Sequence, residues 1–177
     1  MKKLSLISTT AFAFIMLLCT NVNGQKFPGL DKSPLDLASY ASKEAGTMIK
    51  VFYSRPQLKG RTIGTDLAPY GKMWRTGAND ATEIILFTDM KLGNTTVKAG
   101  TYSLFTIPGE KEWTLIFSTD TNSWATSGYK ESNEIARTTI PATKGDESIE
   151  AFAIAFDKNG TMNLGWGNIR VAVPFTK

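Results

Sequence analysis

The stretch "TYSLFTIPGEKEWTLIFS", residues 101–118, decides the fold class of this 177-residue chain. In its second half a tryptophan, a leucine and a phenylalanine occupy every second position and most of the neighbouring positions are polar, which is the pattern of a half-buried β-strand. Between the halves, Pro108 fixes its own φ and Gly109 suits the positive-φ position of a tight turn. The stretch therefore predicts a β-hairpin of strands 101–107 and 112–118.

Two further hairpins follow from the same reasoning. Within residues 148–156, small and large apolar side chains alternate from Ala151 onward, and a turn rich in Asp, Asn and Gly at 157–160 joins this strand to 161–166. Nearer the N-terminus, β-branched and aromatic residues favour pairing of 37–42 with 47–53. Many short strands separated by turns are typical of a sandwich or a barrel.

The remaining elements complete the predicted architecture. Four consecutive apolar residues within 83–88 predict a central strand that is buried on both faces. One short helix is predicted near 132–137, where Ser132 would cap it. We therefore predict a mainly β, single-domain protein, an antiparallel β-sandwich or partly open barrel with one long ordered loop and at most one short helix.

The N-terminus has the pattern of a secretory signal peptide. Lys2 and Lys3 precede an apolar run at 11–18, and small residues end the segment at Gly24. The run is shorter than the roughly 20 apolar residues that span a membrane. We therefore predict cleavage before Gln25, a periplasmic or extracellular location, and no integral membrane segment in the mature chain.

Removing the first 24 of the 177 residues leaves 153, and we expect them to form one domain over 25–177. Cys19 leaves with the signal peptide, so the mature chain has no disulfide bond. Lys2 and Lys3 leave as well, without any acid, and the formal net charge falls from +4 to +2. So small an excess of positive charge does not support nucleic-acid binding.

The absence of histidine restricts the chemistry further. Without His and Cys, the mature chain has neither the Ser-His-Asp and Cys-His nucleophilic sites nor the usual zinc ligand sets. Acid–base catalysis would have to use carboxylates, lysines or tyrosines with shifted pKa values. We therefore favour a protein that is not an enzyme, and we assign no catalytic residue, no metal site and no cofactor.

Residues 55–80 break the strand pattern and predict a long loop. Four glycines and two prolines within them forbid a long regular element, while several apolar residues argue against disorder. Long ordered loops in compact domains are usually functional. The loop has five basic residues and only two acids, Asp66 and Asp80. It is therefore the candidate site.

The functional hypothesis is a small pocket for an anionic or glycan-like ligand. Arginine recognises carboxylate or phosphate through two parallel hydrogen bonds, and aromatic rings stack on sugars or on arginine. The candidate ligand-binding residues are Arg55, Lys59, Arg61, Tyr70, Lys72, Trp74, Arg75 and Asn79.

A purely structural role for the same residues is the alternative. Trp74 would then fill the end of the core, and Arg75 would pair with Glu83 and Asp80 or bind loop carbonyls. Asn79 would cap the turn that enters the next strand. Under this alternative the remaining basic residues are ordinary solvated surface charges.

Two other functions stay open. An interaction or structural module would contact another protein of the cell envelope through its surface. A carboxylate-dependent hydrolase would need two acids at the appropriate spacing, with Asp80 and Glu83 or Glu110 and Glu112 as the pairs. Trp124 and Trp166 are predicted either to offer a platform for a sugar ring or to fill the core.

Four segments together resemble a known family, in the order YSRP at 53–56, KGR at 59–61, PYGKMWRTGAN at 69–79 and AGTYSLFTIPG at 99–109. The family consists of secreted bacterial proteins catalogued as domain of unknown function 2911, and the resemblance covers about 33–175. Two departures touch the candidate site: Thr62-Ile63-Gly64 lacks the usual phenylalanine, and Asp80 replaces the usual glutamate. The resemblance implies export and a single β-rich domain, and it transfers no activity and no catalytic residue. The predicted function is non-catalytic ligand binding in the cell envelope.

Overall fold

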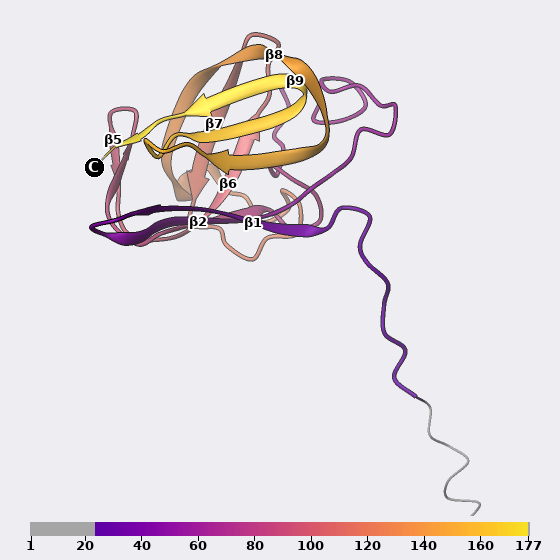
Figure 1. The fold of residues 1–177 in the computed structure, drawn as a ribbon, viewed down its shortest axis with the longest axis horizontal. Helices are drawn as coiled ribbons and strands as arrows, with labels where there is room; N and C mark the ends of the chain where they lie inside the picture. Colours follow the sequence, from indigo (N-terminus) through magenta and orange to yellow (C-terminus); the bar gives the residue numbers. More distant parts are fainter. Residues whose placement is uncertain (1–23, 177) are drawn as a thin grey trace, which may run out of the picture. The chain divides into compact units, whose positions relative to one another are not determined.

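The structure is a computed structural model, and it describes residues 24–176 (Figure 1). The predicted signal peptide therefore lies outside the described residues except for Gly24. Contacts divide the chain into a segment ending at Leu30, which contains no regular element from residue 24 on, and a unit that begins at Asp31. The second unit contains all the strands between residues 24 and 176.

This unit is almost entirely β. Its strands are β1 (Leu35–Ser42), β2 (Gly46–Ser54), β3 (Thr82–Leu86), β4 (Met90–Leu92), β5 (Thr95–Val97), β6 (Gly100–Ile107), β7 (Glu112–Ser118), β8 (Glu134–Phe156), β9 (Met162–Val173) and β10 (Phe175–Thr176). A single 3-10 turn, η2 (Glu131–Asn133), precedes β8, and residues 24–176 contain no α-helix. The predicted mainly β class is confirmed.

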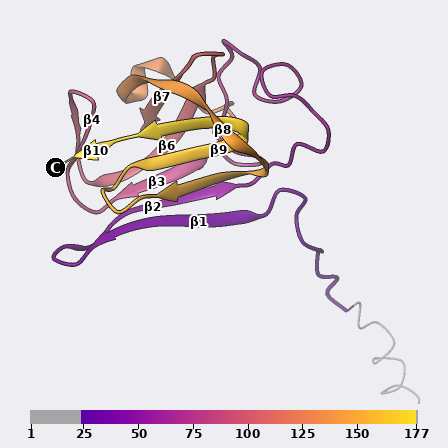
Figure 2. The same ribbon diagram turned by 45° about the horizontal axis from the view of Figure 1, so that its top comes forward.

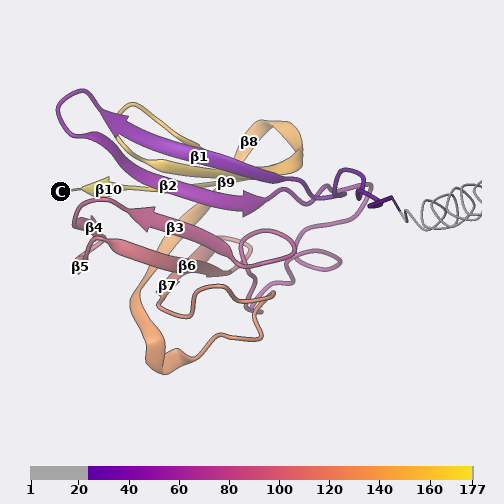
Figure 3. The same cartoon turned by 90° about the horizontal axis from the view of Figure 1, so that it is seen from below.

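Seven strands form one antiparallel sheet in the order β1-β2-β3-β6-β7-β8-β9, and β10, β4 and β5 form a small second sheet. Figure 3 shows β1, β2, β3 and β6 side by side. The sheet curls, so that β8 and β9 return toward β1 and β2 and the whole forms a half-barrel (Figure 2). Of the two predicted architectures, the partly open barrel is the one observed.

The hairpin of β6 and β7 has the predicted strands, but its glycine has a different reason. Gly109 is not among the residues with positive φ. A Cβ at this position would instead lie 2.5 Å from the backbone oxygen of Glu112, closer than real Cβ atoms come to other atoms. Glycine is therefore needed because the two sides of the turn approach closely.

The prediction for β3 was wrong in one respect. Its residues alternate between buried and half-buried, and Phe87, which follows the strand, is 52% exposed. The reason is that only the inner face of the sheet packs on the core at this position. The apolar run Ile84 to Phe87 therefore contributes alternately to the core and to the outer surface.

The predicted helix near 132–137 was also wrong. Only Glu131–Asn133 forms a 3-10 turn, and its N-cap is Lys130, without a side-chain cap from Ser132. From Glu134 onward the chain pairs with β7, as Arg137 lies opposite Ile116. The ladder of β7 satisfies the backbone groups of this segment, and this pairing outweighs its weak helical tendency.

The predicted hairpins at the two ends of the sheet are confirmed, and the second extends further than expected. β1 pairs with β2 in antiparallel register, and β8 and β9 flank the turn after Phe156. At 23 residues β8 is long enough to pair with β7 through its first half and with β9 through its second. Register shifts after Lys144 and Ile149 interrupt its ladder, and such bulges bend a strand. This bend turns the sheet into a half-barrel.

Candidate functional site

The half-barrel closes at one end through the chain that comes after β2. The N–H of Leu58 donates to the carbonyl of Glu150 at 2.9 Å, and the N–H of Phe152 donates to the carbonyl of Pro56 at 2.9 Å. The start of the long loop is thus paired with the second half of β8. This pairing fixes where the loop begins.

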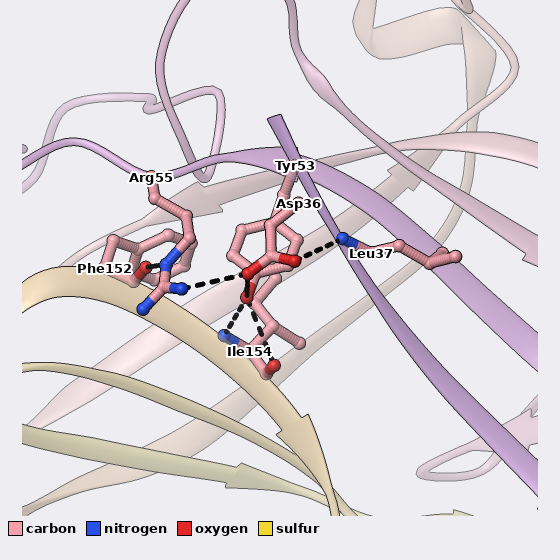
Figure 4. A network of polar contacts seen from close by, with 6 residues as sticks. All are labelled: Asp36, Leu37, Tyr53, Arg55, Phe152 and Ile154. Atoms are coloured by element: carbon pink, nitrogen blue, oxygen red, sulfur yellow. Dashed lines mark hydrogen bonds and ion pairs between the residues drawn. The ribbon is translucent and has the colours of Figure 1, made fainter. Parts of the chain in front are cut away.

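Arg55 takes part in this closure (Figure 4). Its Nε donates to the carbonyl of Phe152 at 3.0 Å, and its NH1 lies 3.0 Å from the Asp36 carboxylate of β1. Both side chains of the ion pair are partly exposed, at 34% and 40%. Arg55 is therefore occupied by its own chain, and it does not line the cavity of the long loop.

Tyr53 supports the same closure from within the core. Its hydroxyl accepts the N–H of Ile154 at 3.0 Å and lies 3.3 Å from the carbonyl oxygen of that residue (Figure 4). The hydroxyl also lies 3.3 Å from the Asp36 carboxylate. Burial raises the pKa of Tyr53, so its hydroxyl keeps its proton across the neutral range. The side chains of Tyr53 and Arg55 thus bind the backbone edge of β8, and Asp36 of β1 contacts both of them.

The rest of the long loop is held by backbone hydrogen bonds to the hairpin of β6 and β7 and to β3. Trp74 and Thr106 exchange two of them, at 2.7 and 2.9 Å, and the N–H of Gly71 donates to the carbonyl of Pro108 at 2.8 Å. The carbonyl of Arg75 accepts the N–H of Thr82 at 3.0 Å. The loop is therefore ordered along the edge of the core, as an anchored segment would be.

Trp74 lies in the core and is only 8% exposed. Its ring stacks on Trp166 with centroids 5.4 Å apart, and it meets Trp113 and Phe152 edge to face at 5.8 and 5.1 Å. Its indole N–H donates to the carbonyl of Gly77 at 3.0 Å. Trp74 therefore fills the core, the role that the structural alternative predicted, and offers no free ring face for a sugar.

A cavity of about 440 Å³ lies along this loop. Its lining combines two arginines, one carboxylate and an amide with apolar side chains. The lining residues are Ser33, Pro56, Arg61, Asp66, Leu67, Ala68, Pro69, Met73, Trp74, Arg75, Gly77, Ala78, Asn79 and Trp166. Its size falls within the range of small-molecule sites.

Arg75 is the most unusual residue of this lining. Its Nε is buried and has no hydrogen-bond partner in the part of the chain that the structure describes. The predicted ion pairs with Glu83 and Asp80 are absent between these described side chains. Burial lowers the pKa of the Arg75 guanidinium, because desolvation penalises its charged form. The cavity thus contains a cation that the protein itself does not neutralise.

Arg61 and Asn79 also line the cavity, but much of their hydrogen-bonding capacity is used. Arg61 donates from Nε to the carbonyl of Leu58 at 3.1 Å and from NH2 to that of Gln57 at 2.7 Å. The amide of Asn79 donates to Asp31 at 3.2 Å. Two hydrogen bonds lower the pKa of Asp31: the larger effect comes from the backbone N–H of Ser33, and the smaller one from the Asn79 amide. These contacts position both side chains.

The other three candidates lie outside the cavity lining. Lys59 and Lys72 are exposed, and Tyr70 is 40% exposed. The Tyr70 ring covers Gly64, where a Cβ would lie 2.5 Å from the ring, so this tyrosine packs within the loop itself. Of the eight candidates, the structure therefore brings together Arg61, Trp74, Arg75 and Asn79.

Sequence reasoning missed two contributors to the lining. In the sequence Asp66 stands out only as an exception among basic residues, although it lies in the same cavity. Trp166 comes from β9, about 90 positions further along the chain, and nothing local to the loop indicated its approach. The negative charge of Asp66 among the basic residues of the loop was the one feature of the sequence that could have indicated its role.

The other candidate features lie elsewhere. Asp80 and Glu83 border a second depression of about 330 Å³, where Glu83 accepts the N–H of Asn122 at 3.2 Å. Glu110 and Glu112 are both exposed at the hairpin turn. Trp166 is 2% exposed and belongs to the core, whereas Trp124 is 64% exposed.

Two properties of the whole described chain bear on function. Between residues 24 and 176, no three side chains of the His, Cys, Asp and Glu types gather as metal ligands would. In the same range, no helix has the length and apolar character needed to cross a membrane.

Comparison with known proteins places the chain by family. No curated protein matches the chain, and no solved structure matches it. A family model described as a protein of unknown function, DUF2911, matches residues 33–175, which include all ten strands except the last residue of β10. The cavity lining falls entirely within the matched residues. The chain belongs to the DUF2911 family.

Proposed function

We propose that this protein is an exported, non-catalytic binding protein of the cell envelope whose cavity takes a small anionic ligand. The observation that carries the proposal is the Arg75 guanidinium, which lines the cavity with a buried, unpartnered Nε among the described residues. The pattern at the N-terminus and the absence of His and Cys from the mature chain support export and a non-catalytic role.

The buried Nε of Arg75, which has no partner among the described residues, has an energetic cost that a bound anion would offset. A buried donor without a partner costs about 1–3 kcal/mol, and a charged one costs more. Proteins tolerate such costs chiefly where function needs them, and perturbed groups gather at functional sites. A carboxylate or phosphate is the natural partner of a guanidinium. The contrast with Arg55, which is engaged by its own chain, strengthens the assignment to Arg75.

A glycan-like ligand receives less support. Sugar recognition commonly uses an exposed aromatic face, and both tryptophans of the cavity, Trp74 and Trp166, are buried in the core. The acids considered for hydrolysis belong to another depression or to an exposed turn. A small anion is therefore the ligand class that the lining favours.

A second function is favoured by a different observation. Leu35 and Leu37 of β1 are 71% and 48% exposed, and Leu37 lies opposite Phe52 of β2 on the outer face of the sheet. Exposed apolar side chains that gather on one face are typical of a protein-binding surface. Contact with another envelope protein through this face is compatible with anion binding in the cavity.

The proposal predicts that Arg75→Met abolishes anion binding without destabilising the protein. The substitution removes a partly buried, unpaired charge and keeps an unbranched side chain of similar length, so the ligand-free melting temperature should stay equal or rise. Affinity for the best-binding anion should fall at least about tenfold, which corresponds to about 1.4 kcal/mol. Calorimetric titration and thermal melts with glutarate, phosphate and glucose 6-phosphate measure both quantities.

Lys72→Met is the matched control, because it removes one positive charge from the same loop outside the cavity. It should leave affinity and melting temperature nearly unchanged. In the unsubstituted protein, an anion present at 100 times its dissociation constant should add about 2.7 kcal/mol to stability. The proposal is wrong if neither these three anions nor any other small molecule with a carboxylate raises the melting temperature, or if Arg75→Met binds as tightly as the unsubstituted protein.

A further inference from the structure

The cavity at the long loop contains charges of both signs that do not neutralise one another. Arg61, Arg75 and Asp66 all line it. No nitrogen–oxygen distance of 4.0 Å or less joins Asp66 to either arginine, although all three side chains are described. A cavity built only for an anion would not benefit from an acid in its wall, because like charges repel.

Asp66 is held in place by its own loop. Its Oδ2 accepts the N–H of Thr62 at 2.9 Å, and its N–H donates to the carbonyl of Thr62 at 3.1 Å. Within residues 24–176, its Oδ1 has no hydrogen-bond donor. Asp66 is exposed, so this oxygen is open to solvent and to a donor bound in the cavity that Asp66 lines.

The rest of the lining carries no charge. It includes the apolar residues Pro56, Leu67, Ala68, Pro69, Met73 and Ala78, but polar atoms make up the larger part of the cavity surface. Sites that orient a small molecule place a small number of polar groups at defined points of their lining. Here the charged groups would orient a molecule that has two opposite charges.

We propose that the ligand of this cavity is a zwitterion, a free α-amino acid or a short peptide. Its carboxylate binds the Arg75 guanidinium, and its ammonium group binds the free oxygen of Asp66. This inference rests on the proposed anion-binding function and adds to it the cationic end of the ligand. It assigns Asp66 as a specificity-determining residue.

Four ligands separate the contributions of the two ends. L-Leucine has both charges, 4-methylpentanoate lacks the ammonium group, L-leucinamide lacks the carboxylate, and leucyl-leucine separates the charges by a second residue. Calorimetric titration at pH 7 should show that leucine or leucyl-leucine binds at least about fivefold more tightly than 4-methylpentanoate, as an ion pair with a partly solvated acid would give. Leucinamide should bind more weakly than either zwitterion. The ratio of the affinities for leucine and leucyl-leucine shows whether a free amino acid or a short peptide is the preferred ligand.

Asp66→Asn tests the assignment without disturbing the loop, because the amide oxygen can still accept the N–H of Thr62. The variant should bind leucine and 4-methylpentanoate equally, and its affinity for 4-methylpentanoate should equal or exceed that of the unsubstituted protein. Arg75→Met should lose both ligands. An unchanged melting temperature of Asp66→Asn establishes that the fold is intact.

Zwitterion binding and anion binding fail in different ways. If the unsubstituted protein binds 4-methylpentanoate or glutarate as tightly as leucine and leucyl-leucine, or if Asp66→Asn retains the preference, the zwitterion assignment is wrong and anion binding stands. If none of these carboxylates binds and phosphate and glucose 6-phosphate do not bind either, both proposals are wrong.

Discussion

Trp74→Ala is expected to lower the free energy of unfolding by about 3–5 kcal/mol, the usual cost of truncating a large aromatic side chain in a core. The ring of Trp74 contacts Trp113, Phe152 and Trp166, so its removal leaves a cavity among three other aromatic rings. It also removes the hydrogen bond from the indole N–H to the Gly77 carbonyl. Urea denaturation followed by tryptophan fluorescence measures the change.

The matched control is Trp124→Ala, which makes the same substitution at a ring that is 64% exposed. Its effect should remain within about 0.5 kcal/mol, as is usual for surface positions. Equal losses of stability in the two variants would contradict the assignment of Trp74 to the core. Such a result would reopen the hypothesis that its ring serves a ligand.

Tyr53→Phe is expected to lower the free energy of unfolding by about 1–3 kcal/mol, because it removes the hydroxyl that forms hydrogen bonds with the backbone of β8. The N–H of Ile154 loses its acceptor, and the carbonyl of Ile154 and the Asp36 carboxylate lose a donor that they share. The aromatic contact with Phe152 remains, so the loss reports the hydroxyl alone. Thermal melting should show a decrease of about 2–4 °C for each kcal/mol in a domain of this size.

Tyr40→Phe provides the comparison for this substitution. Tyr40 also packs its ring on β8, against Phe156, but its hydroxyl has no hydrogen-bond partner in the described residues. The melting temperature of the Tyr40→Phe variant should therefore stay close to that of the unsubstituted protein. If Tyr53→Phe were equally neutral, the half-barrel would be closed by the backbone hydrogen bonds from Leu58 to Glu150 and from Phe152 to Pro56, and not by the tyrosine.

The two arginines of the long loop illustrate how similar residues acquire different roles. Arg55 and Arg75 lie 20 positions apart in the same segment, and the sequence makes both of them candidates for ligand binding. Arg55 emerges at the end of β2, where Asp36 and the carbonyl of Phe152 surround it. Arg75 comes directly after a core tryptophan, and its buried Nε remains without a partner among the described residues. We expect only the second arginine to be free for an anion.

The hairpins could be predicted because their determinants are local. An alternating pattern places one set of side chains on one face, and the turn residues lie next to the strands that they connect. Trp113, Leu115 and Phe117 are accordingly all buried on the inner face. The errors arose where distant packing intervened, as at residues 134–137, where a helix is predicted and the chain instead extends the ladder of β7.

The candidate site was predictable as a segment but not as a set of residues. Glycines, prolines and an excess of basic side chains identified 55–80 as an ordered loop without regular structure. Whether a given cation is engaged depends on Asp36, Phe152 and other groups far away in the chain. The presence of Asp66 and Trp166 in one cavity depends on the same long-range contacts.

Residue order alone therefore specified an antiparallel β protein, its main hairpins and the loop that carries the site, since periodicity and turn chemistry act over a few residues. The curl of the sheet determined which distant residues of the chain contact one another. It brought β8 against the start of the loop, engaged Arg55, buried Trp74 and left Arg75 and Asp66 apart in one cavity. Those outcomes depend on which groups desolvate one another across the fold, and desolvation is a property of the packed structure.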